Sequence, residues 1–261
     1  MIIASYNILK GGEDRWENIL GVVHGIRPDV LALQECNGWE NCIEHRQNEM
    51  GFRGGCAELC CGTPTKSGNR YHVVTASRIA PVSSFGIRGM HHAALETVYV
   101  TSAGELSIVN CHLDPHSSYD RLRELENIVA RQTGRDLAII VGDMNMLSEH
   151  DEYPVWYPRD FSDSLRETFL RNGRMVFDES KFLQRKGYHD VAVLLEKNQH
   201  ATMPTALSEH DDGLFFRVDY CWALGDTASL VECYKVVDAP EVEHASDHHP
   251  IVIVLNVELV S

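Results

Sequence analysis

The strongest constraint on the fold of this chain is a short apolar run that ends abruptly in polar residues. Residues 137–141 read Leu-Ala-Ile-Ile-Val, Gly142 follows, and Asp143 and Asn145 come next. Five apolar residues are too few for a membrane span or an ordinary helix, so the run predicts a buried strand. In extended geometry Asp143 and Asn145 point to the same side. The same residues also fit a simple turn, where Gly, Asp and Asn are favoured.

The same pattern recurs along the chain. Apolar segments stop beside acids, amides or imidazoles at six places, namely Asn7, Glu35, His112, Asp143 with Asn145, Asp219, and Asp247 with His248. This is the arrangement expected if several strands deliver side chains to one edge of a layered sheet. Hard oxygen ligands such as Glu35 and Asp247 suit magnesium or manganese better than zinc. His248 suits an acid or base, although a His beside an Asp is also common on ordinary surfaces.

Periodicity places the remaining elements. Apolar residues at helical spacing predict helices over 13–26, where Pro28 follows the end, and over 119–132, with Ser117 or Ser118 as cap. Shorter helical stretches are expected near 162–171 and 178–186, and a long surface excursion over 36–72. Runs rich in Val, Ile and Thr predict strands at 1–4, 29–35, 72–76, 96–101, 106–111, 214–223, 230–237 and 251–257.

Composition narrows the class of protein. A chain of 261 residues with 44% hydrophobic content can bury a full core, and we expect one domain over residues 1–261. The formal charge of −15 argues against strong, sequence-independent binding to duplex nucleic acid, which depends on Lys and Arg. No apolar run approaches about 20 residues, and the start lacks the basic residues of a signal peptide. We therefore expect a cytoplasmic protein without membrane insertion.

The eight cysteines are expected to be reduced thiols rather than a disulfide framework. Cys36, Cys111, Cys221 and Cys233 adjoin apolar runs and are expected to act there as small core residues. The cluster of Cys56, Cys60 and Cys61 lacks the tight four-ligand spacing of a structural zinc site, so a loop with exposed thiols is expected.

The motifs, in this order, resemble the endonuclease/exonuclease/phosphatase family, which includes relatives of pancreatic deoxyribonuclease, abasic-site endonucleases, neutral sphingomyelinases and inositol polyphosphate phosphatases. The resemblance covers nearly the whole chain. Its parts are Ser5-Tyr-Asn7, Leu33-Gln-Glu35, Asn110-Cys-His112-Leu113, Gly142-Asp-Met-Asn145, Arg217-Val-Asp219-Tyr220 and Ser246-Asp-His248-His-Pro250, with a weaker trace at Thr202-Met-Pro204. Each tripeptide is weak alone, and together they form a strong signal.

The resemblance implies an α/β (α+β) fold, a four-layered α/β/β/α sandwich in which two mostly antiparallel sheets pack face to face. It also implies roles for the residues at the strand ends. Glu35 would be the principal metal ligand, helped by Asn7 and Asp247. His248, held by Asp219, would act at the scissile phosphate. His112 and Asn145 would bind phosphate oxygens, and Asp143 would orient or deprotonate the attacking water.

Taken singly, several of these residues fit other roles. His112 fits a hairpin residue bonded to backbone, Asp219 a buried partner of Arg217, and Asn7 a turn former. Arg70 and Tyr71 fit the lining of a substrate groove, but a surface position without a role is the favoured interpretation for both. Five other histidines match nothing clearly and are expected to be structural or peripheral: His91, His92, His150, His210 and His249.

The sequence thus predicts a hydrolase of phosphoesters that depends on Mg²⁺ or Mn²⁺. The first choice is a phosphodiesterase acting on a small, nucleotide-derived or single-stranded substrate, because the acidic balance disfavours a processive nuclease. A DNA or RNA endo- or exonuclease is the alternative, and a non-catalytic binding protein that kept the fold is a distant one. The segment 153–157 contains aromatic residues that fit either stacking on a ring of the substrate or packing against the core. The sequence indicates no obligate protein partner.

Overall fold

Two six-stranded sheets form the centre of the molecule. The computed structural model describes residues 1–66, 68–208 and 213–260. The strand order of the first sheet is β13-β14-β1-β2-β4-β3, with β1 (Ile2–Asn7), β2 (Val30–Gln34), β3 (Cys56–Cys60), β4 (Val73–Ser77), β13 (Val231–Val236) and β14 (Ile251–Leu255). The order of the second is β11-β12-β8-β7-β6-β5, with β5 (Ser83–Gly86), β6 (Ala93–Thr101), β7 (Gly104–His112), β8 (Leu137–Asp143), β11 (Tyr188–Asp190) and β12 (Asp219–Leu224).

Both sheets are mostly antiparallel, as predicted. Each contains one parallel pair, β1 with β2 in the first sheet and β7 with β8 in the second. The pairings are otherwise antiparallel. A separate two-stranded ribbon is formed by β9 (Leu170–Arg171) and β10 (Arg174–Met175).

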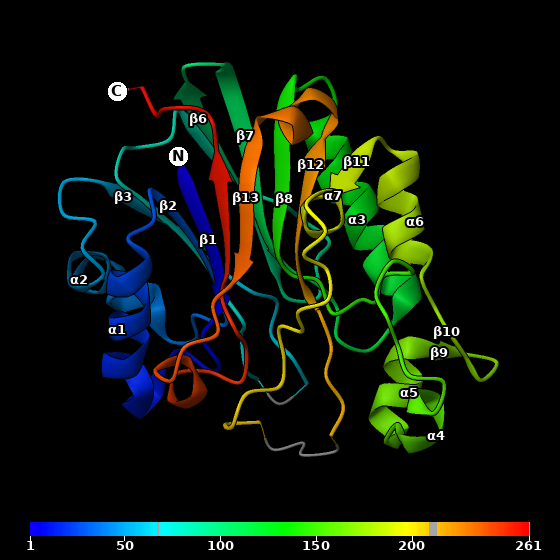
Figure 1. The fold of residues 1–261 in the computed structure, drawn as a ribbon. Helices are drawn as coiled ribbons and strands as arrows, with labels where there is room; N and C mark the ends of the chain where they lie inside the picture. The colour runs from blue at the N-terminus through cyan, green and yellow to red at the C-terminus, as the bar shows by residue number, and fades with distance from the viewer. Residues whose placement is uncertain (67, 209–212, 261) are drawn as a thin grey trace.

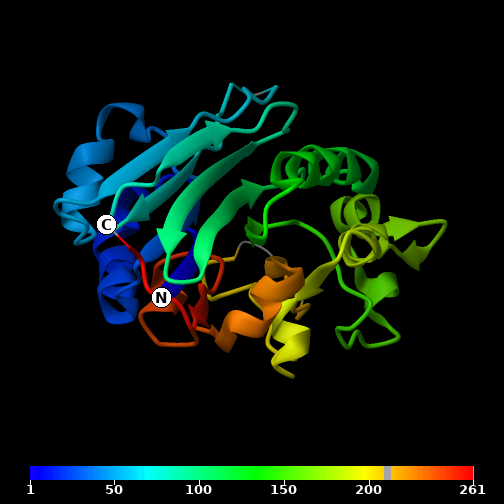
Figure 2. The same cartoon turned by 90° about the horizontal axis from the view of Figure 1, so that it is seen from above.

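Helices cover the outer faces of the two sheets. Figures 1 and 2 show α1 and α2 on one side of the sandwich and α3 and α6 on the other. The α-helices are α1 (Trp16–Ile26), α2 (Ile43–Glu49), α3 (Ser118–Gln132), α4 (Tyr157–Asp160), α5 (Asp163–Phe169), α6 (Asp178–Arg185) and α7 (Val191–Leu194). Short 3-10 helices are η1 (Glu13–Arg15), η2 (Trp39–Asn41), η3 (Gly225–Leu230) and η4 (Val242–His244). The predicted α/β/β/α sandwich is confirmed.

Alternation along the strands builds the layers. Ile139 and Val141 of β8 face the core between the sheets, where they pack with Ile3 and Ile251. Ile140 points the other way, into the core under α3. Each side chain of this size contributes roughly 1.5–3 kcal/mol when it is buried. A strand that is apolar on both faces is therefore the signature of a sheet covered on both sides.

Local sequence explains the ends of the two main helices. The side chain of Ser117 accepts a hydrogen bond from the Asp120 amide and caps α3, as predicted. At the end of α1, Arg27 adopts a left-handed conformation with φ of 54° and donates its amide to the Val23 carbonyl. Pro28 follows and cannot continue the helix.

The segment 36–72 differs from the surface excursion that we expected. It contains η2, α2 and β3, and β3 pairs along its whole length with β4. The predicted loop at Cys56–Cys60 is therefore wrong, because these residues form the edge strand of the first sheet. Cys56 and Cys60 are half-buried and Cys61 is exposed. All eight cysteines are free, which agrees with the reduced state predicted for them.

Among the described residues, no helix has both the length and the apolar character needed to cross a bilayer.

Candidate active site

Strand register brings the polar strand ends to one edge of the sandwich. Asn7 is the last residue of β1 and pairs with Gln34, directly before Glu35. His112 pairs with Asp143 at the ends of the parallel strands β7 and β8. Asp143 in turn pairs with Asp219, the first residue of β12. The prediction that several strands deliver side chains to one edge is confirmed.

The tight approach of β7 and β8 requires the glycine that precedes Asp143. Gly142 has φ of 144°, and a Cβ at this position would lie 1.9 Å from the carbonyl oxygen of Cys111. Any side chain here would push the two strands apart. The glycine that interrupts the apolar run therefore sets the distance between His112 and Asp143.

His248 is buried between two carboxylates. Its Nδ1 lies 2.8 Å from Asp219 Oδ2, and its Nε2 lies 3.8 Å from Asp143 Oδ2. Burial alone would lower the pKa of this imidazole, but the nearby carboxylates of Asp219, Asp143 and Asp247 outweigh burial and raise the pKa well above 6.5. The three carboxylates therefore favour the protonated form of His248, whose side chain lines the pocket.

Asp143 is the centre of a hydrogen-bond network. Its Oδ2 accepts from Asn7 Nδ2 at 2.9 Å and lies 3.4 Å from His112 Nε2, and its Oδ1 accepts from the Asn145 amide at 3.1 Å. Burial raises the pKa of this carboxyl group. The backbone bond to Asn145 makes a short turn in which Asn145 has φ of 47°. Our expectation of extended geometry at Asn145 is thus wrong, because β8 ends at Asp143.

Asn145 nevertheless faces the same pocket as Asp143. Its Nδ2 donates to the Leu113 carbonyl at 3.2 Å, which fixes the orientation of the amide. Asparagine tolerates the left-handed region better than most residues, so the turn explains why an amide stands here. The stretch therefore forms a turn and also lines the pocket, so both interpretations apply to it.

Glu35 lies directly after β2 in a left-handed conformation with φ of 60°. Its Oε1 accepts from Asn7 Nδ2 at 3.3 Å and its Oε2 from the Lys10 amide at 2.9 Å. Burial raises the pKa of Glu35, and the neighbouring charge of Asp247 raises it further. Asn7 presents its nitrogen to the acids, since its Oδ1 accepts from the Leu9 amide at 3.1 Å.

The donors present here fit a hard divalent ion. Glu35 and Asp247 bring two carboxylates close enough to repel each other, and Asn7 adds an amide whose oxygen would reach the site after a half-turn. The side chains at this site are not already gathered around one point. Among the described residues, one group of three His, Cys, Asp or Glu side chains has its ligand atoms within 4.8 Å of one another, and that group lies outside this site. Mg²⁺ is commonly held by one or two carboxylates plus water, so the set suits Mg²⁺ or Mn²⁺.

Five of the predicted site residues line a pocket of about 600 Å³, namely Glu35, His112, Asp143, Asn145 and His248, whereas Asn7, Asp219 and Asp247 lie behind them and are not among its lining residues. Of the two proposed groove residues, Tyr71 lines this pocket, whereas Arg70 is exposed and is not among the lining residues. The full lining is Glu35, Thr65, Lys66, Tyr71, His91, His92, His112, Pro115, His116, Asp143, Asn145, Met203 and His248. The volume lies in the range of small-molecule sites.

A group of histidines on one wall was missed. His92 lies with its ring 4.3 Å from that of His112 and 4.6 Å from that of Tyr71. His91 Nδ1 lies 2.8 Å from Asp114 Oδ2. The expectation that His91 and His92 are structural or peripheral is wrong, because both line the pocket. The signal was available, since the His-His pair directly precedes the strand that pairs with the end of β7.

Burial disfavours the charged form of two histidines of this wall, His92 and His112. It lowers the pKa of His112 to about 3 and also lowers the pKa of His92. The neutral imidazole is thus favoured at His112 and His92, whereas the carboxylates favour the charged form at His248, which approaches the same Asp143 oxygen as His112. Of the other unassigned histidines, His150 is exposed near Gln184, His249 lies beside a second cavity, and His210 falls outside the described residues.

Two alternative readings are now decided. Arg217 does not pair with Asp219, because its guanidinium group binds Asp151 and Asp190. In the segment 153–157, Tyr153 and Tyr157 pack with the aromatic cluster around Phe216, which favours core packing over ring stacking. Val155 and Trp156 remain exposed.

The weak motif Thr202-Met-Pro204 contributes to the site through Asp219. Thr202 Oγ1 accepts hydrogen bonds from the amides of Val218 and Asp219 at 3.0 and 3.1 Å. Met203 lines the pocket beside His248. The segment therefore holds the residue that positions His248 and also closes one side of the pocket.

Comparison with known proteins agrees with this geometry. The sequence model of the Endonuclease/Exonuclease/phosphatase family matches residues 4–248. A search of curated proteins by sequence finds no match. The structure is similar to an AP endonuclease from Archaeoglobus fulgidus, with a TM-score of 0.73, 20% identity and coverage of 98% of this chain and 99% of that one.

Two further solved structures are similar over nearly their whole lengths. One is an endonuclease/exonuclease/phosphatase family protein from Leptotrichia buccalis, with a TM-score of 0.72, 16% identity and coverage of 98% and 99%. The other is the 3′ phosphatase NExo from Neisseria bound to a product DNA hairpin, with a TM-score of 0.69, 16% identity and coverage of 98% and 99%. At these identities the likeness establishes a shared fold.

Proposed function

The chain belongs to the endonuclease/exonuclease/phosphatase family of phosphoester hydrolases, and we propose that it is a phosphodiesterase dependent on Mg²⁺ or Mn²⁺. Its substrate is a small, nucleotide-derived or single-stranded phosphate compound, and its place is the cytoplasm. The observation that carries this proposal is the placement of His248 between Asp219 and Asp143 at the wall of a pocket that also contains Glu35.

Glu35 and Asp247, with Asn7, would hold the metal. When bound, a divalent ion neutralises negative charge that develops on the phosphate oxygens and lowers the pKa of water. Glu35 is already oriented by the Lys10 amide and by Asn7. Glu35 is therefore held in place before an ion binds, whereas the Asn7 amide would have to turn to present its oxygen.

The protonated imidazole of His248 performs the electrostatic part of the reaction. In-line attack on a phosphoester places negative charge on non-bridging oxygens and on the leaving oxygen. His248 stabilises that charge and can donate its Nε2 proton to the leaving oxygen, while Asp219 holds Nδ1. Stabilisation that grows toward the transition state accelerates the reaction, so its effect falls on kcat.

Asp143, Asn145 and His112 act on the attacking water and on the phosphate oxygens. Asp143 orients the attacking water or accepts its proton, since burial makes this carboxylate more basic than usual. Asn145 and the neutral His112 bind phosphate oxygens as uncharged hydrogen-bond donors. Tyr71 lines the same wall as His112 and supports the part of the substrate next to the phosphate.

A nuclease is the second candidate. The similar structures of an AP endonuclease and of a 3′ phosphatase bound to a DNA hairpin favour it. The net charge of −15 argues against a duplex substrate, because duplex binding is dominated by phosphate contacts with Lys and Arg. We therefore place a small or single-stranded substrate first.

A substrate panel tests the proposal. Metal-stripped protein is assayed with and without Mg²⁺ on bis(p-nitrophenyl) phosphate, p-nitrophenyl phosphate, a dinucleotide, single-stranded DNA and duplex DNA. We expect Mg²⁺-dependent turnover of the diesters, with the dinucleotide or single strand preferred over duplex. Turnover of the monoester alone contradicts the phosphodiesterase assignment, and a preference for duplex DNA favours the nuclease.

A further inference from the structure

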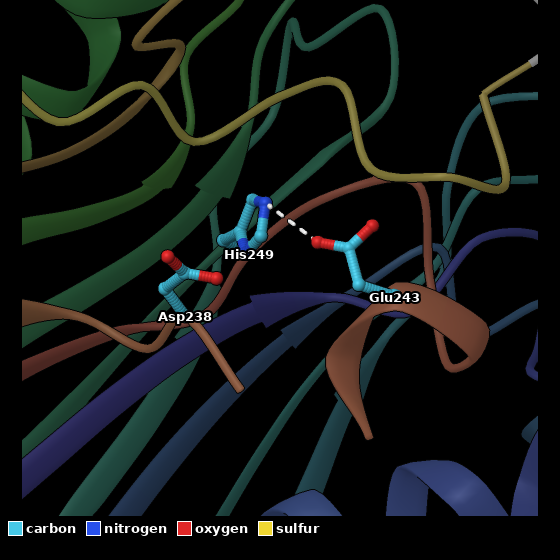
Figure 3. Close-up of side chains that lie close together, drawn as sticks. All are labelled: Asp238, Glu243 and His249. Atoms are coloured by element: carbon cyan, nitrogen blue, oxygen red, sulfur yellow. Dashed lines mark ion pairs between the residues drawn. The ribbon is translucent and has the colours of Figure 1, made fainter. Parts of the chain in front are cut away.

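A second group of potential ligands lies outside the active-site pocket. Asp238 follows β13, Glu243 lies in η4, and His249 precedes β14. Each offers one ligand atom, and these atoms all lie within 4.8 Å of one another. Figure 3 shows the imidazole of His249 between the two carboxylates. We propose that this group binds a divalent transition-metal ion such as Zn²⁺ and that the ion stabilises the segment 202–206 beside the active site.

The imidazole of His249 is oriented as a metal ligand. Its Nδ1 lies 3.2 Å from the Val237 carbonyl oxygen, which can only accept a hydrogen bond, so Nδ1 carries the proton. This leaves the lone pair on Nε2, which lies 3.8 Å from Glu243 Oε1. That separation is too long for a hydrogen bond. Metal-binding histidines commonly donate their second nitrogen to a backbone carbonyl in this way.

The carboxylates are also placed to receive a cation. Glu243 Oε2 accepts from the Ala206 amide at 2.8 Å, so Oε1 is the oxygen left toward His249. The His249 side chain is only 12% exposed, whereas Asp238 is exposed and free to close on an ion. Two atoms bound to one Zn²⁺ lie at most about 4.3 Å apart. A small movement of Asp238 and Glu243 therefore completes the site.

The donor types select the kind of ion. One imidazole nitrogen with two carboxylates suits Zn²⁺ and related transition ions, whereas Mg²⁺ prefers oxygen donors alone. The three side chains line a cavity of about 470 Å³, and His200 lines the same cavity. Within the part of the chain that the structure describes, this cavity shares no lining residue with the active-site pocket. The two sites are chemically and spatially distinct, although His248 and His249 are consecutive.

Residues 202–206 connect the proposed ion site with the active site. Glu243 holds the Ala206 amide, and the Thr205 amide donates to the Asp247 carbonyl at 3.1 Å. The His249 amide donates to the Thr202 carbonyl at 2.7 Å. Met203 of this segment lines the catalytic pocket. An ion that fixes Glu243 and His249 therefore fixes the segment that carries Met203.

Zn²⁺ binding by calorimetry tests this site in the full chain. The parent protein carries Glu35→Gln to weaken the catalytic site, and Glu243→Gln and Asp238→Asn are added singly. Glu243→Gln retains an oxygen for the Ala206 amide, and Glu241→Gln, an exposed neighbour, is the matched control. We expect one Zn²⁺ in the parent and control, and affinity at least about 10-fold weaker in both ligand variants. Equal affinity in all four proteins overturns the proposal.

Cobalt provides a second measurement on protein with an intact catalytic site. With excess Mg²⁺ present, Co²⁺ is added and its visible absorption is followed. We expect a visible Co²⁺ spectrum typical of a site with an imidazole ligand, and we expect this spectrum to be absent in Glu243→Gln. We also expect slower hydrogen exchange over 202–206 when Zn²⁺ is bound. A Co²⁺ spectrum that Mg²⁺ abolishes, or that persists unchanged in Glu243→Gln, overturns the assignment. Neither measurement depends on the phosphodiesterase activity.

Discussion

Arg217 and Asp219 stand two residues apart, yet they belong to two buried charge networks of opposite character. Arg217 binds Asp151 and Asp190 and donates through all three guanidinium nitrogens. Every carboxylate oxygen of these two acids has a donor, including the hydroxyl groups of nearby tyrosines and the Ala192 amide. The Arg217 network is closed.

The network around Asp219 is open. The carboxylates of Asp219, Asp143 and Asp247 face His248 and raise its pKa, whereas burial lowers the pKa of the nearby His112 to about 3. Oδ1 of Asp219 is buried and has no hydrogen-bond partner among the described residues. The contrast teaches that satisfied buried charges stabilise the fold, whereas an excess of negative charge beside a pocket marks the place where a cation and a phosphate are expected.

Breaking the closed network should cost the most. Arg217→Met leaves Asp151 and Asp190 buried without their partner, and we expect the free energy of unfolding to fall by about 3–5 kcal/mol. Urea denaturation measures the loss. The control is Arg171→Met, because Arg171 is 63% exposed in its pair with Asp178 and such a pair contributes about 0–1 kcal/mol. Similar losses in both variants contradict a structural role specific to Arg217.

Removing the proton donor of the open network should affect catalysis more than folding. For His248→Asn we expect kcat to fall about 10²–10³-fold, the usual effect of losing one donor to the transition state. The melting temperature should fall less than in Arg217→Met, because the Asn amide can still donate a hydrogen bond toward Asp219. His45→Asn is the control, since His45 is 74% exposed. A parent-like kcat in His248→Asn removes His248 from the mechanism.

A smaller effect is expected from the residue that positions His248. Asp219→Asn keeps an oxygen to accept from Nδ1 but removes the charge that raises the pKa of His248. We expect activity to fall about 10–100-fold. The pH profile of kcat should lose activity at lower pH than in the parent, because the imidazole gives up its proton sooner. A reduced rate with an unmoved pH profile would make Asp219 merely structural.

The smallest effect is expected for the buried, uncharged His112. His112 stays uncharged in the folded protein down to a pKa of about 3, while in the unfolded chain it gains a proton below about pH 6.5. The unfolded state then binds more protons, so stability falls as the pH drops through this window. Between pH 7 and 5.5 the loss should be about 1 kcal/mol smaller in His112→Gln than in the parent, measured by urea denaturation. Equal losses contradict the burial of a neutral His112.

Much of the fold was predictable because its strands are apolar on both faces. Runs such as 137–141 and 251–255 have few alternatives once helices of known period lie between them. What escaped was structure whose side chains carry weak periodicity. The strand β3 is half-buried at an edge and is rich in cysteine, and β5 is exposed along its length. Only pairing with a neighbouring strand makes such segments regular.

The site residues that stand at strand ends could be predicted from the sequence. Those that reach the pocket through strand pairing could not. Glu35, Asp143 and His248 stand beside apolar runs, so their convergence followed from sheet architecture. His92 reaches the pocket through the antiparallel register that sets its neighbour Ala93 opposite His112. The left-handed turn at Asn145 likewise depends on a backbone hydrogen bond to Asp143. Registers and turns of this kind come from tertiary contacts rather than from local pattern.

The most direct test of the open network is the Mg²⁺ dependence of phosphodiester hydrolysis. Metal-stripped parent and Glu35→Gln are titrated with Mg²⁺ while the hydrolysis of bis(p-nitrophenyl) phosphate is followed. We predict saturable activation of the parent, and in Glu35→Gln either no activity or a Mg²⁺ requirement at least about 10-fold higher. Full activity of the parent in the presence of a chelator, or identical Mg²⁺ curves for the two proteins, would contradict the account.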